Sequence, residues 1–378
     1  MSQEPPLLPR LRAKLQHLQE IGQWRQPRLP AGAVDFTSND YLGLARDGNL
    51  RAQVLAAAAD FPLGSTGSRL LTGHLALAAQ VEEALAAHFC AGAALLFTSG
   101  YSANLGLLGS LFTQGEQVWF DDRVHASMRE GLKLSPATTH AFPHNNVEAL
   151  RAGIRKHGAT GIVVESLYSM DGDAAPLQEL AAIAREAGAV LLVDEAHAAG
   201  VLGPQGAGLV VDAGLDEGAA FGRVVTFGKA FGGLGAAVLG PPLLREWLVN
   251  RARSQIYTTA PPPPQLLHTL HALPRLAAAD EARAHIQHLQ AALAGSGHPQ
   301  VRSGPGAIAA WHQPGNYQVL AAAQQAQHAG YDVRPIRKPT VPAGTERIRI
   351  CLHSYNTPEE LQGLLAVLHQ AAESAPAW

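Results

Sequence analysis

Residues 189–197 read AVLLVDEAH, and residues 223–232 read RVVTFGKAFG. Each stretch is an apolar run of strand length, and reactive side chains follow it: a carboxylate in the first stretch and a lysine in the second. Similar apolar runs occur on both sides, and helical patterns separate most of them. Continuous apolar strands that alternate with helices are typical of a mostly parallel sheet covered on both faces. The sequence therefore predicts an α/β fold whose ligands bind at the carboxyl ends of the strands.

The predicted elements of this sheet occupy most of residues 93 to 240. Strands are expected at 94–98, 117–120, 161–165, 189–193, 223–227 and 235–239, and helices at 101–112, 146–157 and 177–187.

A smaller α+β pattern follows the proline run at 261–264. The proline run suits either a linker or a tight turn, and we favour the tight turn. A long helical stretch reaches residue 294, and a helix at 10–21 precedes a short strand at 34–37. We expect three parts: an N-terminal arm with the first small-domain elements, a large domain, and a connecting helix with a small C-terminal domain, at 1–45, 46–265 and 266–378. The elements expected after residue 300 are strands at 307–311, 331–336 and 346–351 and helices at 317–329 and 358–372.

Composition narrows the class of protein. The 378 residues carry a formal net charge of -3, which argues against a general electrostatic grip on nucleic acid. Two cysteines, Cys90 and Cys351, cannot build a disulfide framework, and both are expected as core thiols. We find no apolar signal-peptide core and no run of about 18 apolar residues. A cytosolic globular protein is the expectation.

Lys229 stands between Gly228 and Ala230, just past an apolar strand. A lysine at such a place is partly desolvated, which lowers its pKa and exposes an amine nucleophile. It is suited to form a Schiff base with a carbonyl cofactor. The alternative is a lysine that extends out of an apolar turn into water.

Asp194 ends the other strand, and His197 follows three residues later. An aspartate at that sheet edge suits the protonated ring nitrogen of pyridoxal phosphate, and the histidine suits the ring hydroxyl. A capping aspartate with a structural histidine is the alternative. The letters DEAH also suggest a helicase, but that function needs a GxxxxGK[ST] phosphate loop, and Ala230 follows the single glycine-lysine step.

Three further stretches carry candidate ligand-binding residues. Thr98–Asn104 joins a strand to a helix, and small residues at a helix N-terminus suit a phosphate. His125 follows a strand and opens a helix, where an imidazole suits either stacking on a flat cofactor or a structural role. Arg347 and Arg349 alternate on a predicted strand, so both face one side, which is either a carboxylate site or a solvated face.

Nine motifs in order resemble the α-oxoamine synthase family of pyridoxal-phosphate enzymes, over nearly the whole chain. The resemblance implies the fold-type I, aminotransferase-like architecture, a large sheet domain plus a small α+β domain. The motifs are SNDYLGL at 38–44, GSTGSRLLTG at 64–73, TSGYSAN at 98–104, DRVHAS at 122–127, SMDGD at 169–173, DEAH at 194–197, TFGKAFG at 226–232, IYTTAPPP at 256–263 and PTVPAGTERIRI at 339–350.

The resemblance also implies roles for single residues, with pyridoxal 5'-phosphate as the cofactor and no metal. Lys229, His125 and Asp194 correspond to the catalytic Schiff-base lysine, the ring-stacking histidine and the pyridinium partner. His197 corresponds to the partner of the cofactor hydroxyl. Further cofactor contacts correspond to Gly100, Tyr101, Ser169, Thr226 and Thr258, the last from a neighbouring subunit, and substrate contacts to Asn39, Arg349, Arg337 and Tyr257.

Two departures from the family pattern matter. The run Ala198-Ala199-Gly200 replaces a common Gly-Thr-Gly, so a bond made by that threonine is in doubt, and the stretch 290–316 is short. Thr258 implies a homodimer with shared sites.

The segment 337–345 most resembles the biotin-pathway members that condense L-alanine with a pimeloyl thioester of coenzyme A or acyl carrier protein. The alternatives are family members of the glycine C-acetyltransferase, 5-aminolevulinate synthase or serine palmitoyltransferase type. An aminotransferase on the same fold is a further alternative.

Overall fold

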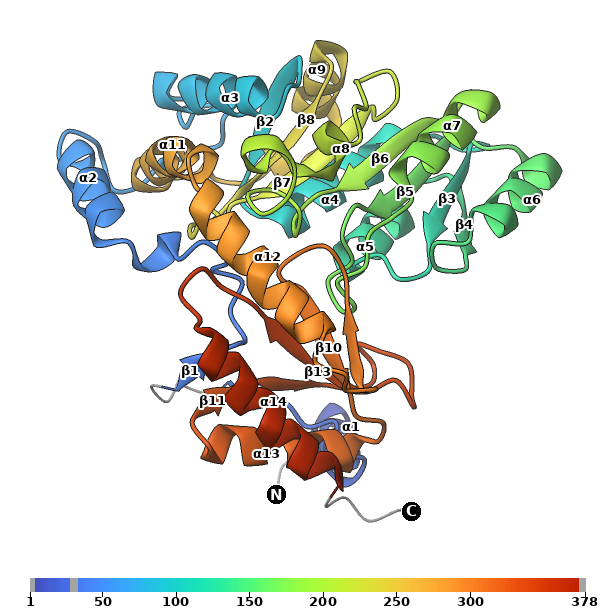
Figure 1. Ribbon diagram of the computed structural model, residues 1–378. Helices are drawn as coiled ribbons and strands as arrows, with labels where there is room; N and C mark the ends of the chain where they lie inside the picture. The colour runs from blue at the N-terminus through green and yellow to red at the C-terminus, as the bar shows by residue number, and fades with distance from the viewer. Residues whose placement is uncertain (1–3, 28–32, 374–378) are drawn as a thin grey trace.

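The computed structural model describes residues 4–27 and 33–373 (Figure 1). Its central element is a seven-stranded sheet in the order β2-β8-β7-β6-β5-β3-β4, in which only β8 runs antiparallel to its neighbours. The predicted α/β fold with a mostly parallel sheet is confirmed. In sheet order the strands are β2 Ala93–Phe97, β8 Ala236–Gly240, β7 Gly222–Thr226, β6 Val190–Asp194, β5 Gly161–Glu165, β3 Gln117–Asp121 and β4 Thr138–Phe142.

Helices cover both faces of this sheet, as alternating residues of β2 show. Ala94 and Leu96 belong to a buried cluster that includes side chains of α3 and α11, whereas Leu95 and Phe97 belong to a second cluster that includes α4. Alternate side chains of β2 therefore pack into two separate cores, one on each face of the sheet. The helices of this part are α2 Gly48–Ala58, α3 Ala76–His88, α4 Gly100–Leu111, α5 Ala126–Leu134, α6 Val147–His157, α7 Leu177–Ala187, α8 Gly208–Asp212, α9 Pro242–Arg251, α10 Arg253–Ile256 and α11 Pro263–Ala277.

A smaller unit lies below the large sheet in Figure 1, with α12 running between the two. Its sheet is antiparallel, in the order β12-β13-β10-β9, and β1 pairs with β11 in a separate parallel pair, which joins the N-terminal arm to the C-terminal part. The domain boundaries stay a prediction. The elements are α1 Leu7–Glu20, β1 Val34–Asp35, α12 Asp280–Ala294, β9 Val301–Ser303, β10 Ile308–His312, α13 Asn316–His328, β11 Tyr331–Asp332, β12 Arg334–Ile336, β13 Arg347–Cys351 and α14 Pro358–Glu373.

Several local expectations were wrong. The predicted strand 331–336 is two strands in two sheets, because buried Val333 separates them. The long helical stretch is two helices, broken at residues 278–279. Cys90 is exposed, and only Cys351 is a core thiol. The proline run contains the start of α11. Proline has no backbone N–H, and the first turn of a helix tolerates it because N–H groups there have no partner within the helix. Among the described helices, none is long and apolar enough to cross a membrane.

Candidate active site

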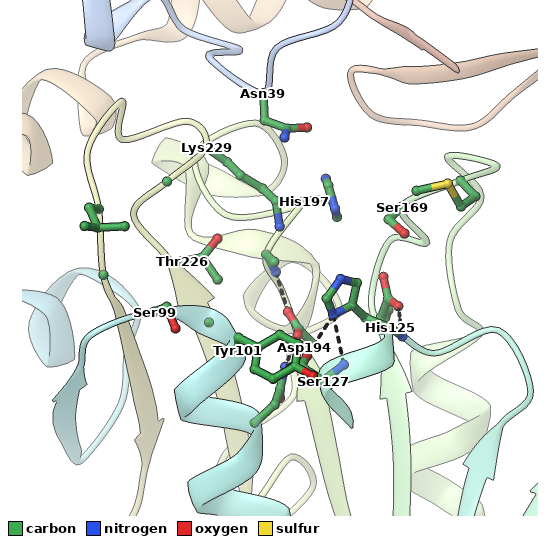
Figure 2. A pocket seen from close by; sticks show the side chains of 18 of the residues that line it. Asn39, Ser99, Tyr101, His125, Ser127, Ser169, Asp194, His197, Thr226 and Lys229 are labelled. Carbon is green, nitrogen blue, oxygen red and sulfur yellow. Dashed lines mark hydrogen bonds between the residues drawn. The ribbon is translucent and has the colours of Figure 1, made fainter. Parts of the chain in front are cut away.

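One cavity of about 320 Å³ opens at the carboxyl ends of β5, β6 and β7, beside the N-terminus of α4 (Figure 2). Ligands of such open sheets bind at this edge. Residues from both parts of the chain line it: Asn39, Ser99, Gly100, Tyr101, Asn104, His125, Ser127, Glu165, Ser169, Met170, Asp194, Ala196, His197, Thr226, Gly228, Lys229, Leu234, Gly235 and Arg349.

The floor of the cavity holds a buried carboxylate, Asp194, the last residue of β6. Asp194 is 6% exposed, and its Oδ1 accepts the backbone N–H of Ala196 at 2.9 Å. Its Oδ2 accepts Nδ2 of Asn104 at 2.7 Å, and the same amide donates to Ser127 Oγ at 3.0 Å. Charge-assisted bonds of this kind fix the direction of a carboxylate.

His125 stands beside this carboxylate at the start of α5. The backbone N–H of Ser127 donates to Nδ1 of His125, and the Ser127 hydroxyl lies 2.8 Å from the same atom. Nδ1 is therefore an acceptor, and Nε2 carries the proton of the neutral ring. Burial lowers the pKa of His125, so that the neutral ring is favoured.

Lys229 follows β7 in a tight loop. Buried Phe227 and Phe231 flank the loop, and Gly232, in the left-handed region at φ 67°, donates its N–H to the Lys229 carbonyl at 2.7 Å. Burial lowers the Lys229 pKa to about 8, against the opposing effect of the Asp194 charge. The amine therefore gives up its proton far more readily than an exposed lysine does.

A second carboxyl group, Glu165, ends β5 directly opposite Asp194 in the sheet register. Its Oε1 accepts the backbone N–H of His125 at 2.6 Å. Burial, and then the nearby charge of Asp194, raise the Glu165 pKa to about 8. Two adjacent buried carboxyl groups do not both ionise easily, so we expect Glu165 to hold a proton at neutral pH.

The N-terminus of α4 forms a polar cradle on one wall. Ser99 caps the helix by accepting the N–H of Ser102. A Cβ on Gly100 would clash with Thr226, whose Oγ1 is buried without a hydrogen-bond partner in the described part of the chain. Free helix N–H groups and an unpaired hydroxyl suit an anionic group.

The opposite wall carries an arginine from β13. Arg349 donates from Nη2 to Asn39 Oδ1 at 2.7 Å and to the Tyr41 hydroxyl at 3.2 Å. Its buried Nε has no partner among the described residues. Because Arg349 lines the cavity, its guanidinium suits a carboxylate there.

An ion-pair cluster connects this arginine's strand to the opposite rim. Asp171 accepts Nη1 of Arg123 at 2.8 Å and also pairs with Nη1 of buried Arg347, two residues before Arg349 on β13. The loop that carries Ser169 is thus bonded to the strand that carries Arg349.

The cavity brings together ten of the thirteen residues predicted from the sequence. Arg337, Tyr257 and Thr258 lie outside its lining. Arg337 donates to the carbonyl oxygens of Gly22 and Trp24, and Tyr257 is 72% exposed beneath the Arg253 guanidinium. The predicted roles of all thirteen stay predictions. The ten that line the cavity are Asn39, Gly100, Tyr101, His125, Ser169, Asp194, His197, Thr226, Lys229 and Arg349.

Sequence reasoning did not single out Glu165 or Asn104 as site residues. Glu165 carries the same signal as Asp194, a carboxylate at the end of an apolar strand. Asn104 lies four residues after Gly100, and thus on the same helix face, within a motif that was already recognised.

Comparison with known proteins agrees with this geometry. The family model described as aminotransferase class I and II matches residues 31–368. The chain is 40% identical to the 8-amino-7-oxononanoate synthase of Anaeromyxobacter sp. (strain K), covering 95% of this chain and 92% of the relative.

Two solved structures share the fold over most of their length. An 8-amino-7-oxononanoate synthase from Francisella tularensis superposes with a TM-score of 0.81 at 28% identity, covering 91% of this chain and 99% of that one. A serine palmitoyltransferase from S. paucimobilis, solved with PLP and myriocin bound, superposes with a TM-score of 0.88 at 29% sequence identity. The match covers 98% of this chain and 99% of that one.

Proposed function

The chain belongs to the aminotransferase class I and II family, and we propose that it joins L-alanine to a pimeloyl thioester with loss of CO2, giving 8-amino-7-oxononanoate and a free thiol carrier. The observation that carries this proposal is the pairing of a desolvated amine, Lys229, with a carboxylate-binding wall at Arg349 in one cavity. Relatives of about 40% identity with that activity support the choice of substrate.

The residues of the cavity fit pyridoxal 5'-phosphate. Lys229 supplies an amine for the aldehyde, Asp194 a carboxylate for the ring nitrogen, and His197 a partner for the ring hydroxyl. The helix N-terminus at Gly100 and the unpaired Thr226 hydroxyl suit the phosphate. When bound, the cofactor supplies an electron sink for negative charge at the amino acid's Cα.

Arg349 and Asn39 bind and orient the amino acid carboxylate. Arg349 lines the cavity, and Nη2 is already bonded to Asn39 and Tyr41, so its remaining guanidinium donors are the ones that hold the carboxylate.

Lys229 moves the proton at Cα. Its amine, with a pKa near 8, is a base of useful strength at neutral pH, and the same group returns a proton after CO2 has left. Asp194 keeps a proton on the ring nitrogen, and Asn104 holds that carboxylate in place. His125 carries its ring proton on Nε2 and offers it to the acyl carbonyl oxygen of the thioester.

We further propose a homodimer with shared sites. Thr258 borders a small hollow next to Thr98 instead of its own chain's cavity, which suits a contact with a neighbouring subunit's cofactor. Large apolar side chains nearby are exposed, among them Leu70 at 53%, Leu71 at 80% and Tyr257 at 72%. Their burial in a dimer would be favourable.

The proposed carrier of the acyl group is coenzyme A or acyl carrier protein, and the cytoplasm is the proposed compartment.

Thiol release from pimeloyl coenzyme A tests the proposal. The protein loaded with PLP should release thiol with L-alanine faster than with glycine or L-serine. Lys229→Ala should abolish release, and Lys133→Ala, an exposed lysine on α5, should not change it. A preference for serine would move the function to the serine palmitoyltransferase type, which the structural neighbour represents. Full release by Lys229→Ala would overturn the proposal.

A further inference from the structure

Tyr41 lies behind the cavity, outside the residues that line it, with its side chain fully buried. Its hydroxyl is 2.7 Å from Nδ1 of His197, 3.0 Å from Oδ1 of Asn39 and 3.2 Å from Nη2 of Arg349. A single oxygen thus contacts one residue predicted to bind the cofactor and two predicted to bind the substrate carboxylate. In Figure 2 the labelled Asn39 and His197 lie at the same end of the site.

The partners of this hydroxyl determine its hydrogen-bond direction. A phenol has one proton to donate and two lone pairs with which to accept. Arg349 can only donate, so it uses one lone pair. Asn39 presents Oδ1, because the same atom accepts Arg349 Nη2 at 2.7 Å, and an oxygen can only accept. The Tyr41 proton therefore goes to Asn39.

The remaining lone pair of Tyr41 faces Nδ1 of His197, so this nitrogen must carry a proton. Burial raises the pKa of Tyr41, which keeps the phenol protonated, and burial lowers the pKa of His197 well below its ordinary value. A neutral imidazole has one proton, and its place is set by the bond that the other side of the ring makes.

We propose, on the basis of the function proposed above, that Tyr41 is a positioning residue: its hydroxyl holds His197 with the proton on Nδ1 and joins it to the Asn39–Arg349 pair. Nε2 of His197 then carries no proton, so it can only accept a hydrogen bond or a proton from the cofactor hydroxyl. Amino acid binding at Arg349 and the orientation of His197 are coupled through one oxygen atom.

Nitrogen NMR of protein labelled with ¹⁵N-histidine tests the proton position. His197 is assigned by the signal that is lost in His197→Asn. In the wild-type protein, with and without PLP, the Nδ1 of His197 should show a bound proton. Asn39→Ala removes the acceptor of the Tyr41 proton, so the phenol should turn toward His197 and the imidazole proton should move to Nε2. A bare Nδ1 in the wild-type protein would overturn the proposal.

Tyr41→Phe tests the coupling. We expect the Nδ1–H signal of His197 to weaken toward a mixture of tautomers and the KM for L-alanine to rise about tenfold, with a smaller change in kcat. Tyr355→Phe is the matched control, since its hydroxyl donates to Asp35 at 3.0 Å, outside the cavity, and both readouts should stay at wild-type values. Wild-type values in Tyr41→Phe would contradict the proposal. Absence of thiol release from the wild-type protein would refute the function alone, because the tautomer is read without turnover.

Discussion

Asn104 donates to Asp194 across 2.7 Å, from the first turns of α4 to the end of β6. Ninety residues separate the two in the chain, and both side chains are buried. The carboxylate that we assign to the cofactor's ring nitrogen is therefore held by a neutral donor, which orients it without removing its charge.

Asn104→Ala should lower kcat/KM about 10- to 100-fold, because a buried hydrogen bond to a charged group contributes about 1.5–3 kcal/mol. The alanine also removes the amide that donates to the Ser127 hydroxyl. Because this hydroxyl bonds to Nδ1 of His125, the imidazole is held less firmly, which adds to the loss of activity. Steady-state thiol release measures the effect. Asn146→Ala, which removes a cap at the exposed start of α6, serves as the control and should leave kcat/KM unchanged. Equal activity of both variants would contradict the role.

The reaction of Lys229 with PLP should have a pH dependence set by its lowered pKa. Only the neutral amine attacks a carbonyl, and burial lowers the pKa of Lys229 from 10.5 to about 8. The rate of PLP uptake by cofactor-free protein should therefore rise up to about pH 8 and then level off. Stopped-flow absorbance measures this rate. A tenfold rise for each pH unit up to pH 10 would mean an ordinary, solvated lysine.

Gly100→Ala should weaken cofactor binding more than it weakens the fold. A Cβ there would push against the methyl group of Thr226, a neighbouring residue that also lines the cavity. We expect the Kd for PLP to rise about tenfold or more, since one charge-assisted bond is lost. Equilibrium dialysis gives the Kd, and Gly48→Ala, where a Cβ would meet open space, is the control. An unchanged Kd in Gly100→Ala would show that the N-terminus of α4 at Gly100 does not bind the cofactor phosphate.

His144 should make the protein's stability depend on pH. Burial disfavours its charge, but hydrogen bonds from Nδ1 to Asp121 at 2.9 Å and from Nε2 to Asp173 at 2.6 Å outweigh this and raise its pKa to about 9. The folded protein then holds a proton that the unfolded chain releases near pH 6.5. The stabilisation is complete below pH 6.5 and is lost as the pH rises to about 9.

The size of this contribution is at most about 3.4 kcal/mol, and urea unfolding at pH 6 and pH 9.5 measures it. His144→Asn should be less stable than the wild type at pH 6 and should lose less stability at pH 9.5. An identical pH dependence in both proteins would show that other groups are responsible.

The sequence predicted most of the sheet because buried parallel strands are continuous apolar runs. Six strands were placed within one residue at each end. The edge strand β4, with the sequence TTHAF, was missed because three of its five side chains are exposed and its pattern is polar. The split at Val333 was also missed, since it depends on which sheet each half joins.

The candidate site was predictable where a residue's place in a strand or helix decides its exposure to the cavity. Asp194 and Lys229 stand at the carboxyl ends of apolar strands, a position that suits a ligand site but also a capping aspartate or a lysine that extends into water. Tyr41 is different, because its importance comes from His197, 156 residues away, and Arg349, 308 residues away. Local patterns contain no information about such partners.

The most direct test of the central claim follows the fate of the amino acid's carboxyl carbon. The protein with PLP, pimeloyl coenzyme A and L-alanine labelled with ¹³C at the carboxyl group should release one labelled CO2 for each thiol. The product, identified by mass spectrometry as 8-amino-7-oxononanoate, should carry no label. With a 2-oxo acid added as amino acceptor, labelled pyruvate without CO2 or free thiol would instead show an aminotransferase, and would contradict the account.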